Sequence, residues 1–269
     1  MSEPLGIIAG NGRFPFLVAE AARKAGRRVV VAAIKEEAFP EIESAGDEVH
    51  WLSLGQLGKC IDTLKAAGVR EAVMAGQVKH RQIFSDVVPD LKLMSVIARL
   101  AFKNTDSLIG GIADALEREG IRLLPSTSLL ADQMASLGAM TRRAPTKGEQ
   151  RDIDYGREIA RTLAGIDLGQ TVVVKDRAAV ALEAMEGTDE VIRRAGRLAG
   201  PGTVVVKIAK PRQDMRFDVP VIGRGTLATM IEAGASVLAV EAERTLLLEK
   251  PEVAREADAA GIALWGMAR

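Results

Sequence analysis

The sequence predicts an α/β protein of two lobes, an N-terminal parallel sheet with helices and a C-terminal mixed α/β domain. The 269 residues exceed what one hydrophobic core commonly fills, which favours two domains. In the first half, short continuous apolar runs alternate with helical patterns, as in a parallel sheet covered by helices. The stretch Gly138–Gln150 has little apolar periodicity. We expect the boundary within Ala131–Gln150 and divide the chain into residues 1–133 and 134–269.

Strands and helices alternate in the N-terminal domain. The expected strands are Leu5–Ala9, Val29–Ala33, Glu48–Leu52, Glu71–Ala75 and Ile121–Leu124, and the expected helices are Phe16–Ala25, Leu57–Ala67, Leu91–Phe102 and Ser107–Glu119. Gly26 and Gly68 follow two of these helices, where glycine favours helix termination. Asp106 stands where the last helix would take its N-cap. A glycine-rich turn after the first strand makes the domain Rossmann-like.

The C-terminal domain begins with a helix and a hairpin. The expected elements are a helix at Ile153–Leu163, paired strands at Thr171–Val174 and Ala178–Leu182, a helix at Asp189–Leu198 and a strand at Thr203–Ile208. Five further segments alternate between helix and strand: Leu227–Ala233, Ser236–Val240, Thr245–Leu248, Pro251–Ala260 and Ile262–Trp265. Asp176-Arg177 forms the expected hairpin turn.

Composition excludes several classes of function. Lys plus Arg equals Asp plus Glu at 36 each, so the net charge is zero and a strongly basic nucleic-acid-binding protein is not expected. Aromatic residues make up only 3%, which leaves few rings for stacking bases. Cys60 is the only cysteine, and His50 and His80 are the only histidines, which excludes disulfide and Cys- or His-rich metal centres. Any metal ion should be a hard one held by carboxylates, such as Mg²⁺ or Mn²⁺.

The N-terminal residues do not resemble a targeting segment. No run approaches the roughly 20 apolar residues needed to span a bilayer. With a single cysteine, this predicts a cytoplasmic protein. Contact with a membrane surface stays open.

The turn Gly10-Asn11-Gly12 has two interpretations. A glycine turn before a helix lets backbone amides approach a phosphate, as in dinucleotide-binding folds. The strict glycine fingerprint fails here because Pro15 occupies its third position. Glu36-Glu37 follows the second strand, where an acid could bind a ribose. The alternative is a tight turn that binds no ligand.

Carboxylates gather around a second glycine turn. Glu183, Glu186 and Asp189 follow a strand and lead through Gly187 into a helix. Such a turn can place oxygens around a hard cation or around a water that needs a base.

Basic residues gather shortly afterwards. From Arg193 to Arg224 there are eight Lys or Arg and two Asp, an excess of six. Four basic residues lie around a proline-containing loop and could surround a phosphate: Lys207, Lys210, Arg212 and Arg216. Acidic and basic clusters together fit phosphoryl transfer, in which one binds a metal and the other binds phosphate oxygens.

Each feature also has a structural interpretation. Thr188 can be an ordinary helix N-cap followed by acids at the positive end of the helix dipole. Asp218 is harder to explain structurally, because it lies between apolar residues where an idle carboxylate is costly. His80 is expected at the surface and Cys60 in the core. The arginines at helical spacing, Arg193, Arg194 and Arg197, fit a solvated face.

At these residues the chain resembles the LpxI-type UDP-2,3-diacylglucosamine pyrophosphatases of lipid A biosynthesis. The resemblance spans nearly the whole chain. The matching segments are Gly6–Gly12, Ala75–Val78, the helix start Asp106-Ser107-Leu108, Asp167–Val174, Glu183–Asp189 and Lys210–Pro220. The last two are the most specific. Arg224-Gly225-Thr226 departs from relatives, which often carry an acid there, and this puts a role for Gly225 in doubt.

The resemblance implies a reaction, a fold and an assembly. Water would cleave the substrate pyrophosphate at the phosphorus attached to the sugar, giving UMP and 2,3-diacylglucosamine 1-phosphate (lipid X). A divalent metal, usually Mg²⁺, would take part, and the lipid would lie between two lobes of a homodimeric protein. We further expect transient contact with the inner-membrane surface, because the substrate has two acyl chains.

The resemblance and the motifs together assign candidate site residues. The expected catalytic residues are Asp218, Asp189, Lys210 and Arg216, and the expected metal ligands are Asp218, Glu183, Glu186 and Asp189. The expected substrate-binding residues are Gly10, Asn11, Gly12, Gly76, Gln77, Asp106, Thr188, Lys207 and Gln213.

Two other functions remain open. An NAD(P)-dependent oxidoreductase would use the Gly10–Gly12 turn but leaves the second-half motifs unexplained. A non-enzymatic nucleotide-sugar or lipid-binding regulator could share the fold. Nicotinamide binding tests the first alternative, and turnover tests the second.

Overall fold

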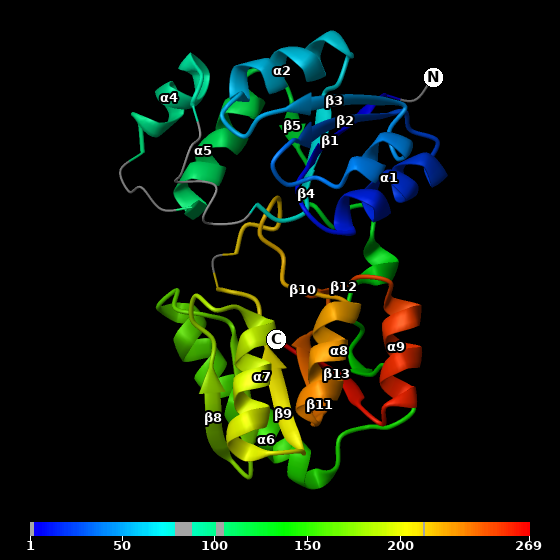
Figure 1. The fold of residues 1–269 in the computed structure, drawn as a ribbon, viewed down its shortest axis with the longest axis vertical. Coiled ribbons are helices and arrows are strands. Elements are labelled where there is room, and N and C mark those ends of the chain that lie inside the picture. The colour runs from blue at the N-terminus through cyan, green and yellow to red at the C-terminus, as the bar shows by residue number, and fades with distance from the viewer. Residues whose placement is uncertain (1–2, 79–87, 101–104, 212) are drawn as a thin grey trace. The chain divides into compact units, whose positions relative to one another are not determined.

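The computed structural model describes residues 3–78, 88–100, 105–211 and 213–269, with only the backbone of 105 and 106. Residue contacts divide the chain into two compact units (Figure 1). The first is Met1–Leu130 with Met215–Phe217, and the second is Ala131–Asp214 with Asp218–Arg269. His80 and Arg212 lie outside the described residues.

The first unit contains a five-stranded parallel sheet, as the apolar runs predicted. Its strands are β1 (Leu5–Ala9), β2 (Val29–Ile34), β3 (Glu48–Leu52), β4 (Glu71–Ala75) and β5 (Arg122–Leu123), in the order β3-β2-β1-β4-β5. The strand order reverses between β1 and β4. Ligands of open α/β sheets bind outside the carboxyl ends of strands at such a point.

Helices cover this sheet. They are α1 (Phe14–Lys24), α2 (Leu57–Ala66), α4 (Leu91–Ile97) and α5 (Thr105–Arg118), with a 3₁₀ turn at Pro40–Ser44. Helices α2, α4 and α5 share one apolar cluster with the sheet, and α1 packs against β1, β2 and β4. Because α5 begins at Thr105, Asp106 lies in its first turn and the expected N-cap was wrong.

The second unit contains a six-stranded mixed sheet. Its strands are β6 (Gly138–Ala139), β7 (Thr171–Lys175), β8 (Ala178–Leu182), β9 (Thr203–Lys207), β11 (Ala235–Glu241) and β13 (Ala263–Met267), in the order β6-β13-β11-β9-β7-β8. Strands β10 (Val221–Ile222) and β12 (Leu246–Leu247) form a separate parallel pair. The expected hairpin is present, and Asp176 and Arg177 both have positive φ.

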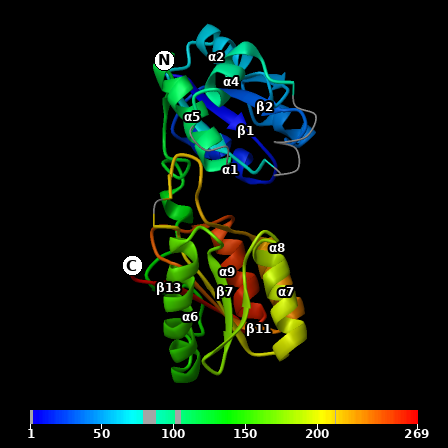
Figure 2. The same ribbon diagram turned by 90° about the vertical axis from the view of Figure 1, so that its left-hand side faces the viewer.

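Two layers of helices enclose the six-stranded sheet. They are α6 (Lys147–Gly165), α7 (Thr188–Ala199), α8 (Arg224–Ala233) and α9 (Lys250–Ala259). Figure 2 shows α6 on one side of the strands and α7 on the other. Helix α6 belongs to one apolar cluster, and α7, α8 and α9 belong to another.

Helix α6 begins six residues earlier than expected. Thr146 accepts a hydrogen bond from the Glu149 amide, and the Glu149 carboxylate accepts one from the Thr146 amide. This capping box starts the helix although its first turn is polar. Apolar periodicity begins only at Ile153, which explains the error.

Among the described residues, no helix is long and apolar enough to cross a membrane.

Candidate functional site

Two loops meet at the carboxyl edge of the first sheet. Gly10 and Asn11 follow β1, and Gly76 and Gln77 follow β4. The Asn11 amide donates to the Gln77 carbonyl at 2.8 Å, and the Gln77 amide donates to the Asn11 carbonyl at 3.0 Å. The fold therefore brings together four of the residues expected to bind substrate.

Glycine is required for this close approach. A Cβ at Gly10 would lie 2.7 Å from the Gln77 carbonyl oxygen, and a Cβ at Gly76 would lie 2.6 Å from that of Asn11. Gly76 also has φ +93°, which side-chain-bearing residues rarely adopt.

The same contacts limit what this turn can offer a ligand. The Gly10 amide donates to the Ala75 carbonyl at 2.9 Å, and the Asn11 amide is used by Gln77. These two amides therefore join the loops and do not form the phosphate cradle considered from sequence. Gly12, with φ +96° and open space at its Cβ position, precedes the helix.

Polar residues also gather at one edge of the second sheet. Strands β8 and β9 are both antiparallel to β7, so they run in the same direction and end at the same edge. Lys207 ends β9, Thr171 is its register partner on β7, and Glu183 follows β8. Register partners point to the same face of a sheet, which explains how residues far apart in sequence meet.

A chain of two hydrogen bonds connects Lys207, Thr188 and Glu183. The Lys207 ammonium donates to the Thr188 hydroxyl at 2.8 Å, and that hydroxyl donates to Glu183 Oε1 at 3.0 Å. Lysine is only a donor, so the direction of the chain is fixed. Gly187 is the N-cap of α7, so the N-cap expected at Thr188 was wrong. The Thr188 hydroxyl instead forms hydrogen bonds with Lys207 and Glu183.

Charge around Lys207 is concentrated. The side chain is only 6% exposed. Burial lowers the pKa of its ammonium, and the charges of Glu183, Asp189 and Asp218 oppose that effect. Three residues expected from sequence to be catalytic or to bind metal therefore lie within electrostatic reach of one buried cation.

Two carboxylates of the acidic turn, Asp189 and Glu186, have different hydrogen-bond partners. Asp189 accepts a hydrogen bond from the Thr226 hydroxyl of α8 at 2.7 Å. Glu186 instead binds Arg194 and the Ala184 amide. Its own amide and the Arg194 side chain lower the Glu186 pKa. Glu186 thus holds the turn together.

Asp218 follows a tripeptide that belongs to the first unit. Within that unit the Met215 carbonyl accepts from the Ser126 amide at 2.9 Å, and Arg216 pairs with Glu117 at 3.0 Å. The Asp218 amide donates to the Asp214 carbonyl at 2.8 Å, within the second unit. Arg216 therefore stabilises the first unit through α5, a contact that sequence spacing did not suggest.

Lys210 and Gln213 belong to the loop after β9. The Lys210 ammonium lies 2.6 Å from Asp167 Oδ1, and its amide donates to Gln213 Oε1 at 2.6 Å. Gln213, expected to bind substrate, closes this loop through its side chain.

The four carboxylates expected to bind metal do not form one group. Among the described residues, no three Asp, Glu, His or Cys side chains come together in a way that could hold a metal ion. Both Glu183 oxygens accept protein hydrogen bonds, from Thr188 and from the Gln170 amide. The side chains of the described residues therefore do not form a preformed metal-binding site.

Sequence reasoning missed Thr171, Gln170 and Glu241. Thr171 Oγ1 lies 3.3 Å from Thr188 Oγ1. Glu241 ends β11, is buried, and accepts from the Ala209 amide at 3.0 Å. Their position at strand ends was readable from sequence, but the strand order that makes them neighbours was not.

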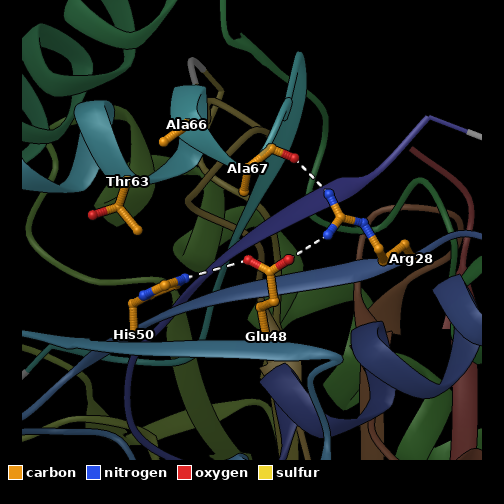
Figure 3. A pocket seen from close by; sticks show the side chains of 6 residues that line it. All are labelled: Arg28, Glu48, His50, Thr63, Ala66 and Ala67. Carbon is orange, nitrogen blue, oxygen red and sulfur yellow. Dashed lines mark hydrogen bonds and ion pairs between the residues drawn. The ribbon is translucent and has the colours of Figure 1, made fainter.

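A shallow pocket of about 380 Å³ lies elsewhere in the first unit (Figure 3). It is lined by Arg28, Glu48, His50, Thr63, Ala66 and Ala67. Glu48 pairs with Arg28 and lies 3.6 Å from His50 Nε2. Arg28 precedes β2 and Glu48 begins β3, so this pocket is at the amino edge of the sheet. The glycine loops are at the opposite edge.

Comparisons with known proteins cover both units. Residues 4–133 match the family model described as LpxI N-terminal domain, and residues 136–265 match the LpxI C-terminal domain. The UDP-2,3-diacylglucosamine pyrophosphatase LpxI of Caulobacter vibrioides is 31% identical over 275 residues, which is 98% of this chain and 97% of the relative.

Similarity to solved structures is much lower. The gox2253 structure is 11% identical with a TM-score of 0.33, covering 99% of this chain and 90% of that chain. Phosphoribosylglycinamide synthetase from Anaerococcus prevotii is 9% identical with a TM-score of 0.28, covering 71% of this chain and 34% of that chain.

Proposed function

The chain belongs to the LpxI family in both of its domains, and on that premise we propose that it hydrolyses the pyrophosphate of UDP-2,3-diacylglucosamine. The products are UMP and 2,3-diacylglucosamine 1-phosphate. The observation that carries this proposal is the likeness to a pyrophosphatase along 98% of the chain.

The proposed chemistry uses the carboxyl edge of the second sheet. A water oxygen attacks the phosphorus attached to the glucosamine, and the bond from this phosphorus to the UMP oxygen breaks. The water loses a proton to a base. Asp218 is the proposed base or water-orienting group. The buried Lys207 ammonium is the proposed counter-charge to Glu183, Asp189 and Asp218. Lys207 acts through Thr188 in this proposal, because its ammonium is already bound to that hydroxyl.

Dependence on Mg²⁺ or Mn²⁺ is a further part of the proposal. Phosphoryl transfer develops charge that a divalent cation neutralises. The described carboxylates do not form a metal centre by themselves.

We also propose a cytoplasmic homodimer that contacts the inner-membrane surface during turnover. A diacyl substrate must be taken from lipid. Val88 and Leu91 are each 86% exposed and Met94 is 53% exposed, so apolar side chains three residues apart face solvent along one segment. Buried CH₂ groups favour lipid by about 0.8 kcal/mol each, which makes this segment the proposed contact. Light scattering of the purified protein tests the dimer.

Release of UMP by the purified protein is the decisive experiment. We expect UMP to form with Mg²⁺, to stop with EDTA, and to resume when Mg²⁺ is restored. Substrate binding without UMP release would instead favour a regulatory binding protein. Calorimetric binding of NAD(H) at micromolar affinity, about −8 kcal/mol, would favour the oxidoreductase.

A further inference from the structure

The position of Lys207 affects whether a metal ion could bind among the carboxylates of the second unit. Its ammonium is buried and donates to Thr188 at 2.8 Å. The charges of Glu183, Asp189 and Asp218 all act on it. These are three of the four residues that we expected to bind a metal ion.

The hydrogen bonds of Glu183 and Asp189 are directed within the protein. Glu183 accepts from Thr188 and from the Gln170 amide, and Asp189 accepts from Thr226. A divalent ion placed among them would lie beside the Lys207 ammonium, which is buried and held by its hydrogen bond to Thr188. Like charges repel strongly where the effective dielectric is low.

We propose that the Lys207 ammonium is a fixed internal counter-ion to Glu183, Asp189 and Asp218, so that these carboxylates do not form a divalent-cation site in the substrate-free protein. A diphosphate substrate would then supply most ligands of the ion, with one or two carboxylates joining. Mg²⁺ is commonly held in this way, through few carboxylates plus substrate phosphates. Lys207 is a positioning residue in this scheme. Only one part of this inference rests on the proposed function, namely that a substrate diphosphate supplies the remaining ligands of the ion.

Binding of Mn²⁺ alone to the free protein tests the inference, with electron paramagnetic resonance as the readout. The wild-type protein should take up no stoichiometric Mn²⁺ at this site up to about 1 mM. Lys207→Gln removes the charge and keeps a donor for Thr188. It should create one site per chain and tighten Mn²⁺ binding at least about tenfold.

Lys175→Gln is the matched control. The Lys175 ammonium donates to the Ala199 and Pro201 carbonyls at 2.7 and 2.8 Å, without a carboxylate partner among these bonds. This variant should bind Mn²⁺ as the wild type does. Adding Asp189→Asn to Lys207→Gln should remove the gained site. A gained site that survives Asp189→Asn lies elsewhere and contradicts the inference.

Tight Mn²⁺ binding by the free wild-type protein, below about 100 μM and lost in Asp189→Asn, would overturn the inference. This measurement needs no variant of Lys207, so it decides the matter even if Lys207→Gln fails to fold. Absence of UMP release with Mg²⁺ present would count against the proposed pyrophosphatase and leave this result unaffected.

Discussion

Asp218 has the proposed role of base or water-orienting group. It lies within electrostatic reach of the buried Lys207 and directly follows a tripeptide held in the first unit. Asp218→Asn keeps the size of the side chain and removes its charge. We expect UMP release to fall at least about hundredfold, because general acid–base groups contribute that much or more. Nucleotide binding and melting temperature should change little.

The control for Asp218 is Asp132→Asn, an exposed carboxylate in the same unit, which should keep full activity. A stable Asp218→Asn variant with more than about a tenth of wild-type kcat would remove Asp218 from the mechanism. Equal loss of stability and activity would indicate a purely structural role.

Thr188 links the buried lysine to the buried glutamate. Thr188→Val keeps the shape but leaves Lys207 and Glu183 without this hydroxyl, and unsatisfied buried groups cost about 1–3 kcal/mol each. The variant should lose about that much unfolding free energy in urea, and Thr188→Ser should restore it. A wild-type free energy of unfolding in Thr188→Val would mean that the hydrogen bonds of Thr188 do not contribute to stability.

Among the elements, the two glycine loops of the first sheet depend on each other. Gly76→Ala requires φ +93° for a residue with a Cβ and places that Cβ 2.6 Å from the Asn11 oxygen. Backbone strain of this kind costs about 1–3 kcal/mol, so the melting temperature should fall. Gly110→Ala in α5, where a Cβ meets nothing within 4 Å, should be neutral or stabilising. Equal effects of both substitutions would contradict the contact between the loops.

The start of α6 predicts a pH effect on stability. Burial raises the pKa of Glu149, but hydrogen bonds from Arg143, Thr146 and Ser236 outweigh it and lower the pKa to about 2. The ordinary value is 4.5, so the stabilisation is present above that pH and is lost as the pH falls toward 2.

Glu149→Gln should therefore be less stable than wild type at pH 7, and the difference should narrow between pH 4.5 and about 2. Denaturant unfolding at each pH measures this. Glu158→Gln, an exposed change on the same helix, should show no such narrowing. A constant difference across the range would contradict the assignment.

At the scale of the whole molecule, the proposed membrane contact predicts a surface effect. Leu91→Ser with Met94→Ser removes two exposed apolar side chains from α4. Sedimentation with phospholipid vesicles should fall by at least about threefold, since each buried CH₂ favours lipid by about 0.8 kcal/mol. Leu198→Ser, exposed at the end of α7, is the matched control. Unchanged sedimentation would exclude this segment as the contact.

Local patterns determined much of the secondary structure. Strands β1, β3, β4 and β8 have the bounds expected from sequence. In β1, β4 and β8 a short apolar run lies between turn residues, which is consistent with a buried strand. The start of α6 was missed because its cap is polar. Full-length motifs also pointed to the LpxI family, which the comparisons confirm.

Only the tertiary structure decided which of the candidate residues meet. Strand order makes Lys207 and Thr171 neighbours, and it directs Glu183 toward Thr188 while Glu186 turns to Arg194. Sequence spacing treated those two glutamates alike. They differ because contacts between strands and helices distant in sequence fix where each carboxylate finds its partner, and no local pattern contains that information.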